Sequence, residues 1–128
     1  MELSNEMVET IKNAEQLAIA SNGEDGINIA PLSSVHTEDG LIMLYDFFMD
    51  KTAQNVKQNP EVALAVWIGM AGIQIKGKVS YQTEGDIFTS REAWAKVKFP
   101  DRILKGVLVL TPEVVYDLTP SNAGARLA

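Results

Sequence analysis

The stretch from Ile73 to Thr83 constrains the fold most, because its side chains alternate with a period of two. One side of this stretch is apolar or small and the other is polar: Ile73, Ile75, Gly77, Val79 and Tyr81 against Gln74, Lys76, Lys78, Ser80 and Gln82. That period is typical of a β-strand with one buried and one exposed face. Such a strand needs partner strands, so the sequence predicts a β-rich fold.

Further runs rich in Val, Ile, Leu and Ala predict the partner strands. Gln16–Ser21 and Ile27–Ala30 flank the turn residues Asn22–Gly26, which is the pattern of a hairpin. The remaining predicted strands are Leu41–Tyr45 after a loop that ends in Asp39-Gly40, Val62–Ile68 with Trp67 in the core, Ile103–Thr111, and a short Val114–Asp117. We expect His36, in the loop before Leu41, to be solvated.

Three segments predict helices. Ser4–Ala14 has helical spacing of its apolar residues, with Ser4 as the N-cap. Lys51–Gln58 predicts a short helix that ends before Pro60, and Gly85–Lys98 predicts a third. Hairpin-like links between strands favour antiparallel pairing. About six strands in 128 residues predict a mainly β fold, namely a small antiparallel barrel without exposed edges, in one domain spanning residues 1–128.

The composition excludes several classes of function. The net charge of -6, from 17 acidic against 11 basic residues, disfavours binding to nucleic acid. The chain has no cysteine and one histidine, so thiol catalysis, a histidine metal cluster and a Ser-His-Asp triad are excluded. The polar N-terminus does not resemble a secretory signal, and no apolar run has the ~20 residues that span a bilayer. We therefore expect a cytoplasmic protein without membrane contact, whose chemistry belongs to a bound cofactor.

Lys51 and Thr52 form the best candidate for a cofactor site. They stand where a strand ends and a short helix begins, and a helix N-terminus binds anions through its free N–H groups and its dipole. Lys51 would add charge, Thr52 a hydroxyl donor, and Asn55 lies one turn later on the same helix face. The alternative is purely structural, with Asp50 capping the helix and Lys51 paired with Asp46 or Asp50.

The order and spacing of several segments resemble the FMN-binding split-barrel family related to pyridoxamine 5'-phosphate oxidase, in its short single-domain form. The segments that carry the resemblance span nearly the whole chain: Leu17–Ser21 with Gly23–Gly26, Lys51-Thr52 with Asn55-Val56 and Asn59–Leu64, Ile75–Gly77 with Tyr81 and Thr83–Gly85, and Val107–Pro112. The resemblance implies a six-stranded antiparallel split barrel that forms a homodimer with FMN near the subunit interface.

The resemblance also implies roles for individual residues. Lys51 and Thr52, with Asn55 in support, would hold the FMN phosphate. Other cofactor-binding residues would come from two walls and from the partner subunit: Leu44, Tyr45, Asp46 and Phe47 on one wall, Asn28, Ala30, Pro31 and Ser33 on the opposite wall, and Gln74 reaching the cofactor of the other subunit. Packing in a core or a dimer interface suits Phe47, Phe48 and Met49 as well as stacking on the flavin does. Trp94 fits a core, an interface or a lid.

Two classes of function follow. The first is an FMN-dependent oxidoreductase or electron carrier that needs no catalytic side chain and whose electron donor or acceptor is unknown. The second is a non-catalytic module that binds flavin, deazaflavin or heme for storage or sensing. Vitamin-B6 oxidases of the family carry a longer, arginine-rich C-terminal part for their phosphorylated substrate. In this sequence only Ala125–Ala128 faintly resembles that C-terminal part, so we do not expect pyridoxamine-phosphate oxidation. Arg102 and Lys105 would meet an anionic substrate or be ordinary surface residues.

Overall fold

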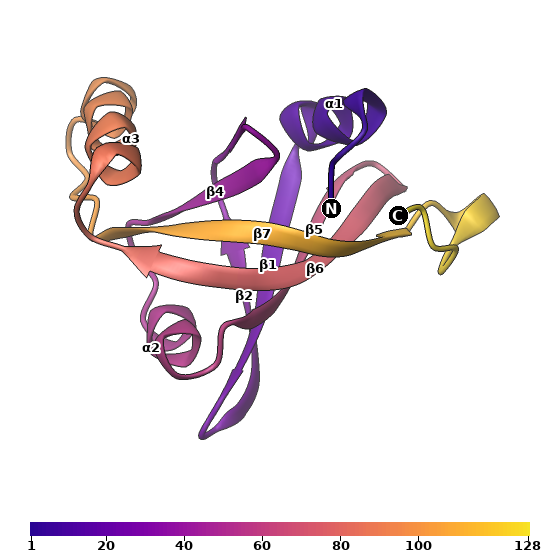
Figure 1. Ribbon diagram of the computed structural model, residues 1–128, viewed down its shortest axis with the longest axis horizontal. Helices are drawn as coiled ribbons and strands as arrows, with labels where there is room; N and C mark the ends of the chain where they lie inside the picture. The colour runs from indigo at the N-terminus through magenta and orange to yellow at the C-terminus, as the bar shows by residue number, and fades with distance from the viewer.

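A computed structural model describes all 128 residues of the chain. Three α-helices, one short 3-10 helix and seven strands alternate along it (Figure 1). The helices are α1 (Asn5–Asn13), α2 (Lys51–Gln58), α3 (Asp86–Lys98) and η1 (Pro120–Asn122). The strands are β1 (Gln16–Gly23), β2 (Gly26–Leu32), β3 (Val35–Glu38), β4 (Leu41–Asp46), β5 (Glu61–Ile68), β6 (Ala71–Gln82) and β7 (Gly106–Asp117).

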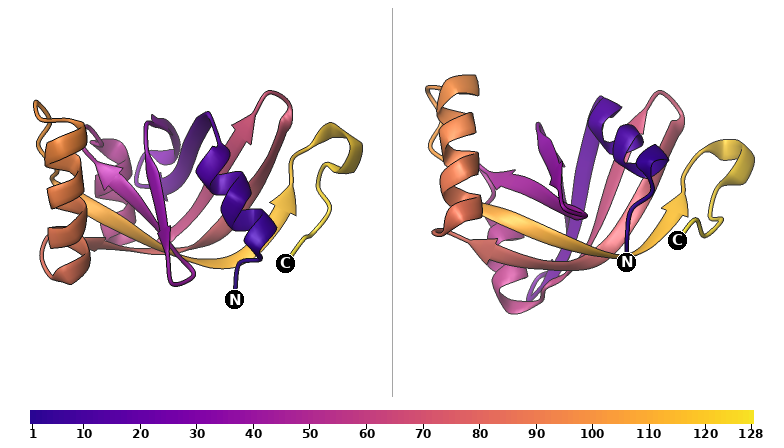
Figure 2. Two further views of the ribbon diagram at one scale, coloured as in Figure 1. Left: turned by 90° about the horizontal axis from the view of Figure 1, so that it is seen from above. Right: turned by 45° about the horizontal axis from the view of Figure 1, so that its top comes forward.

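All seven strands belong to one antiparallel sheet, in the order β2-β1-β5-β6-β7-β4-β3. The sheet curves strongly around its interior, as the views in Figure 2 show. Its two end strands, β2 and β3, do not pair with one another, so the barrel is split. The predicted antiparallel split-barrel class is confirmed, but the sheet has seven strands instead of six and keeps two edges.

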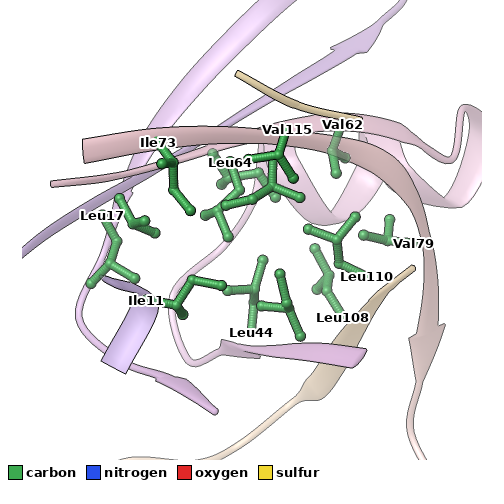
Figure 3. Packing of buried hydrophobic residues seen from close by; sticks show 14 of the residues in the cluster. Ile11, Leu17, Leu44, Val62, Leu64, Ile73, Val79, Leu108, Leu110 and Val115 are labelled. Carbon is green, nitrogen blue, oxygen red and sulfur yellow. The ribbon is translucent and has the colours of Figure 1, made fainter. Parts of the chain in front are cut away.

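The concave side of the sheet holds the main core. Alternate residues of the strands point inward, where Ile19, Leu64, Ile75 and Leu108 have no exposed surface. Figure 3 shows inner side chains such as Leu64, Leu108 and Val115 converging from different strands on one apolar interior. The side chain of Ile11 on α1 joins them, which fixes that helix across the open side of the sheet. Burial of apolar surface is the main stabilising contribution to such a fold.

Helix α1 begins as its sequence predicts. The Ser4 side chain caps it by accepting a hydrogen bond from the Met7 amide at 3.2 Å, and Glu6 in the first turn favours the positive end of the helix dipole.

Helix α3 covers the other face of β4 and β7 and builds a second, smaller apolar cluster. Met43, Tyr45, Phe47 and Val107 contribute to it from the strands and the loop after β4, and Ala95 from the helix. Trp94 is half-buried and packs on Tyr45, with ring centroids 4.9 Å apart. Of the three roles considered for Trp94, the structure gives it that of a core residue.

Three local expectations are wrong. Residues Val35–Glu38 form strand β3 and not a loop, so His36 is half-buried opposite Met43 and is not fully solvated. The two predicted C-terminal strands are one strand, β7, which passes through Pro112. Trp67 lies on the outer face of β5, paired with Gln16 and Gly72, and not in the core. None of the helices combines the length and the hydropathy that a bilayer crossing requires.

Candidate functional site

A buried polar cluster joins helix α2 to the β1–β2 hairpin. The Asn28 amide donates to Thr52 Oγ1 at 3.1 Å, and the Asn55 amide donates to Ser21 Oγ at 3.1 Å. Ser21, Thr52 and Asn55 are each less than a tenth exposed. A side chain at Gly23 would overlap the Asn55 carboxamide, so glycine leaves the space in which Asn55 reaches Ser21. These contacts hold the first turn of α2 in a defined place against β1 and β2.

The N-terminus of α2 lacks the features that usually neutralise a helix end. Asp50 stands at the N-cap position, but its side chain makes no capping hydrogen bond and instead accepts from Gln54 Nε2 at 2.9 Å. The first turn contains no acidic residue. Its N–H groups and dipole therefore keep their capacity for an anion. The structure corrects the alternative in which Asp50 caps this helix.

Lys51 lies at this helix end and points to the surface. Its Nζ is 2.6 Å from Asp25 Oδ2 in the β1–β2 turn, not beside Asp46 or Asp50. The hydrogen bond to Asp25, reinforced by its charge, raises the pKa of Lys51, and the same contact lowers the pKa of Asp25. Both side chains are more than half exposed, so solvent screens the pair. Lys51 is thus a solvent-exposed, charged donor at an uncapped helix end.

Two surface hollows flank the sheet. One of about 50 Å³ lies beside Lys51, Asp25 and Asn55 and has no apolar lining residue. The larger, of about 720 Å³, lies between α1, the β5–β6 turn and the C-terminal tail, and includes Trp67 and Asp117. None of the predicted cofactor residues lines the larger hollow. The small hollow is the size of a polar group and not of a whole flavin.

The end of β4 directs successive side chains to opposite faces. Leu44 is in the main core, whereas Tyr45 and Phe47 belong to the cluster under α3. The Tyr45 hydroxyl accepts from Arg91 Nη1 at 3.2 Å, and burial raises the pKa of Tyr45. With these side chains in the two cores, the backbone is the part of this wall that remains available to a ligand.

Asp46 ties the end of β4 to the loop before α2. It is 1% exposed and accepts from the Tyr81 hydroxyl at 2.5 Å and from the Met49 amide at 2.9 Å. Burial, and then the hydrogen bond to the Asp46 carboxylate, raise the pKa of Tyr81. Asp46 thus sets the path of the loop that leads to Lys51, and its carboxylate is already used within the protein.

The opposite wall is strand β2 and the residue after it. Asn28 and Ala30 lie on the inner face, opposite Ser21 and Ile19, whereas Pro31 pairs with Ala18 on the outer face. Ser33 follows the strand, and its Oγ accepts from Arg102 Nη1 at 3.2 Å. Gln74 lies on the outer face of β6, paired with Ala65 and Tyr116.

The predicted residues therefore fall into separate groups. Lys51, Thr52, Asn55 and Asn28 lie together at the start of α2. Ser33 and Phe47 meet through Arg102, whose guanidinium lies 5.2 Å from the Phe47 ring centroid. Leu44, Pro31 and Gln74 face neither group in this chain.

Sequence reasoning missed several residues that shape this region. Nothing in the spacing of Asp25 indicates its contact with Lys51, and Ser21 carries no signal beyond its place in a predicted strand. Tyr81 continues the period-two pattern, which identifies it as inward-facing without revealing Asp46 as its partner.

The comparisons with known proteins agree with the fold. The family model for pyridoxamine 5'-phosphate oxidase matches residues 3–119. An uncharacterized protein of Methanocaldococcus jannaschii is 32% identical over 132 residues, covering 99% of this chain and 88% of that protein.

Several solved structures share the fold. HupZ of Group A Streptococcus superposes with a TM-score of 0.83 and 24% identity, covering 96% of this chain and 98% of that one. An FMN-binding protein from Syntrophomonas wolfei superposes with a TM-score of 0.77 and 20% identity, covering 88% of this chain and 86% of that one. HutZ, a heme storage protein from Vibrio cholerae, superposes with a TM-score of 0.71 and 14% identity, covering 91% of this chain and 95% of that one. An F420 reductase superposes with a TM-score of 0.67 and 12% identity, covering 88% of this chain and 98% of that one.

Proposed function

Because the chain belongs to the pyridoxamine 5'-phosphate oxidase family, we propose that it is an FMN-binding redox protein of the cytoplasm that holds the FMN phosphate at the N-terminus of α2. The observation that carries this proposal is the first turn of α2, which has no side-chain cap, contains no acidic residue and begins with Lys51. A phosphate would satisfy its N–H groups and the dipole together. The FMN-binding protein among the structural neighbours supports the choice of ligand.

Three residues of α2 would have different roles in binding FMN. Lys51 would leave Asp25 and contribute its charge to the phosphate, and the Thr52 hydroxyl, which accepts from Asn28, would donate its own proton. Asn55 would act indirectly, because its bond to Ser21 holds α2 in place. When bound, FMN supplies the ring that takes up and releases electrons.

Replacing Lys51 tests the phosphate assignment. A charge-assisted hydrogen bond contributes about 1.5–3 kcal/mol, so Lys51→Ala should raise the Kd for FMN about tenfold or more. Titration of the apoprotein with FMN, followed by quenching of flavin fluorescence, measures this. Lys12→Ala on the exposed face of α1 removes the same charge away from the site and should leave the Kd unchanged. Equal Kd values for wild type and Lys51→Ala would reject the assignment.

A non-catalytic binding module is the second candidate, and the heme storage protein and the F420 reductase among the structural neighbours make it worth testing. Heme binding would lack a histidine ligand at α2, since the one histidine, His36, lies on β3 beside Glu38. Native mass spectrometry of the purified protein would name the ligand. Oxidation of a nicotinamide donor by the FMN-loaded protein would favour the redox function over storage.

We also propose a homodimer formed through the outer face of β2, β1 and β5. On this face, 79% of Ile27 and 72% of Ile29 are exposed to solvent. The small side chains of Ala20 and Ala63 lie next to them. Apolar patches of this kind mark interaction surfaces. Gln74 lies beside this face through its pairing with Ala65, which would allow it to reach the cofactor of the partner subunit.

A further inference from the structure

Arg102 occupies an unusual position at the end of the β2 wall. It lies in the loop between α3 and β7, half-buried, with its guanidinium 4.0 Å from the Phe99 ring centroid. The same group is 5.2 Å from the Phe47 ring and 5.4 Å from the Phe48 ring. Three aromatic rings and the hydrogen bond to Ser33 thus hold a planar cation in a defined orientation.

This cation is not neutralised within the chain. No carboxylate oxygen lies within 4.0 Å of Arg102, since the ion pairs of the molecule join other residues: His36–Glu38, Lys51–Asp25, Lys78–Glu113 and Lys96–Glu92. A guanidinium has five N–H donors, and one of those of Arg102 is used, by Ser33. Lys51 differs, because Asp25 already balances its charge. Arg102 therefore has unused donors and a charge that no carboxylate of this chain compensates.

The place of Arg102 relative to α2 suggests what it contacts. Asn28 touches Thr52 at the proposed phosphate end, and Ser33 touches Arg102. These two residues are five positions apart, Asn28 within β2 and Ser33 just after it, which separates them by at most roughly 16 Å. FMN is elongated, with its phosphate at one end and its flavin ring at the other. Phe48 is three residues before Lys51 and 76% exposed, which provides an apolar surface beside the guanidinium.

We propose that Arg102 faces the ring end of the bound FMN and favours its reduced form, so that it raises the reduction potential of the flavin. This inference rests on the proposed FMN binding. Oxidised FMN takes up two electrons and one proton to give a reduced ring with one additional negative charge. A fixed cation with free N–H donors binds that anion more strongly than it binds the neutral oxidised ring.

The experiment compares the midpoint potentials of FMN in the wild-type protein and in Arg102→Gln, by titration with dithionite at pH 8. We expect Arg102→Gln to weaken the preference for the reduced form about tenfold, which for a two-electron couple lowers the potential by about 30 mV. Lys98→Gln removes the same charge from an exposed position on α3 and should shift the potential much less. Arg102→Lys keeps the charge and should retain most of the wild-type potential.

The Kd values of oxidised and reduced FMN give a second readout. In Arg102→Gln the Kd of reduced FMN should rise more than the Kd of oxidised FMN. Equal changes in both, with an unchanged potential, would overturn the inference and leave Arg102 as a general binding residue. If Arg102→Gln does not fold, judged by circular dichroism, Arg102→Met takes its place, because it keeps an apolar stem and loses the charge. The same fall in potential is expected, and a wild-type potential in that variant overturns the inference. A wild-type protein that binds no FMN contradicts the proposed function itself.

Discussion

At the scale of single residues, Asn55 illustrates how a motif residue serves the site without facing the ligand. Its place one turn after Lys51 predicts contact with the same ligand, but in this structure it is buried and donates to Ser21. It fills the space that Gly23 leaves open, since any side chain at Gly23 would overlap it. The helical spacing is correct, but a spacing does not reveal which neighbour from another strand lies opposite.

Asp25 is the residue whose replacement most directly tests the charge balance at α2. Asp25 binds Lys51, so a phosphate must compete with the Asp25 carboxylate for the Lys51 ammonium group. Asp25→Asn removes a negative charge from the site and weakens the hold on Lys51. We expect the Kd for FMN to fall several-fold, most clearly at low salt, where charges are least screened. Isothermal titration at low and at high salt measures this, with Asp86→Asn at the start of α3 as the control. Weaker FMN binding in Asp25→Asn would show that Asp25 assists the ligand.

At the scale of elements, β7 shows why a sequence pattern can divide one strand into two. Thr111-Pro112 interrupts the apolar run, and proline lacks the N–H that a central strand needs. The structure accommodates it with a bulge in β7, where Pro112 pairs with Gly77, Val114 pairs with Lys76, and Glu113 is the extra residue. The pairing partner is remote in sequence, so the local pattern could not reveal it. Strand β3 was missed because it has only four residues, with polar ones among them.

Gly77 should be essential to this bulge. A Cβ at this position would overlap the carbonyl oxygen of Thr111 and crowd Leu110, and backbone cannot move aside as a flexible side chain can. We expect Gly77→Ala to lower the free energy of unfolding by about 1–3 kcal/mol, the usual cost of overpacking. Urea denaturation followed by circular dichroism measures the change. Gly69→Asn is the control, because Gly69 lies in a turn with φ of 58° and open space around it, a conformation that asparagine tolerates. Equal stability of Gly77→Ala and wild type would contradict this account of the bulge.

At the scale of the whole molecule, the two faces of the sheet have different compositions. The inner face is filled by the core and α1, whereas the outer face of β2, β1 and β5 presents isoleucine and alanine to solvent. Ile27, Ile29, Ala20 and Ala63 form a neutral stretch of this face, with Glu61 at its border. A neutral apolar stretch of sheet is suited to packing against a second copy of itself.

The homodimer can be tested by light scattering coupled to size exclusion. We expect the wild-type protein to have about twice the 14.0 kDa mass of one chain. Ile29→Lys would bury an unpaired charge in the interface and should shift the mass toward that of a monomer. Val97→Lys makes the same change at an exposed apolar residue of α3 and should preserve the dimer. A monomeric wild type, or an Ile29→Lys variant that remains fully dimeric, would reject this interface.

The local features of this protein follow from short stretches of its sequence. Helix starts, hairpins and the period of β6 depend on neighbours within a few residues, so the Ser4 cap, the hairpin around Asn22–Gly26 and the Ile73–Thr83 pattern are correct as predicted. Which segments meet depends instead on the tertiary fold. It brought Asp25 to Lys51, Tyr81 to Asp46 and Arg102 to Ser33, pairs separated by 26, 35 and 69 residues. Such contacts arise from how the sheet curves and in which order its strands pair, and no local pattern encodes either.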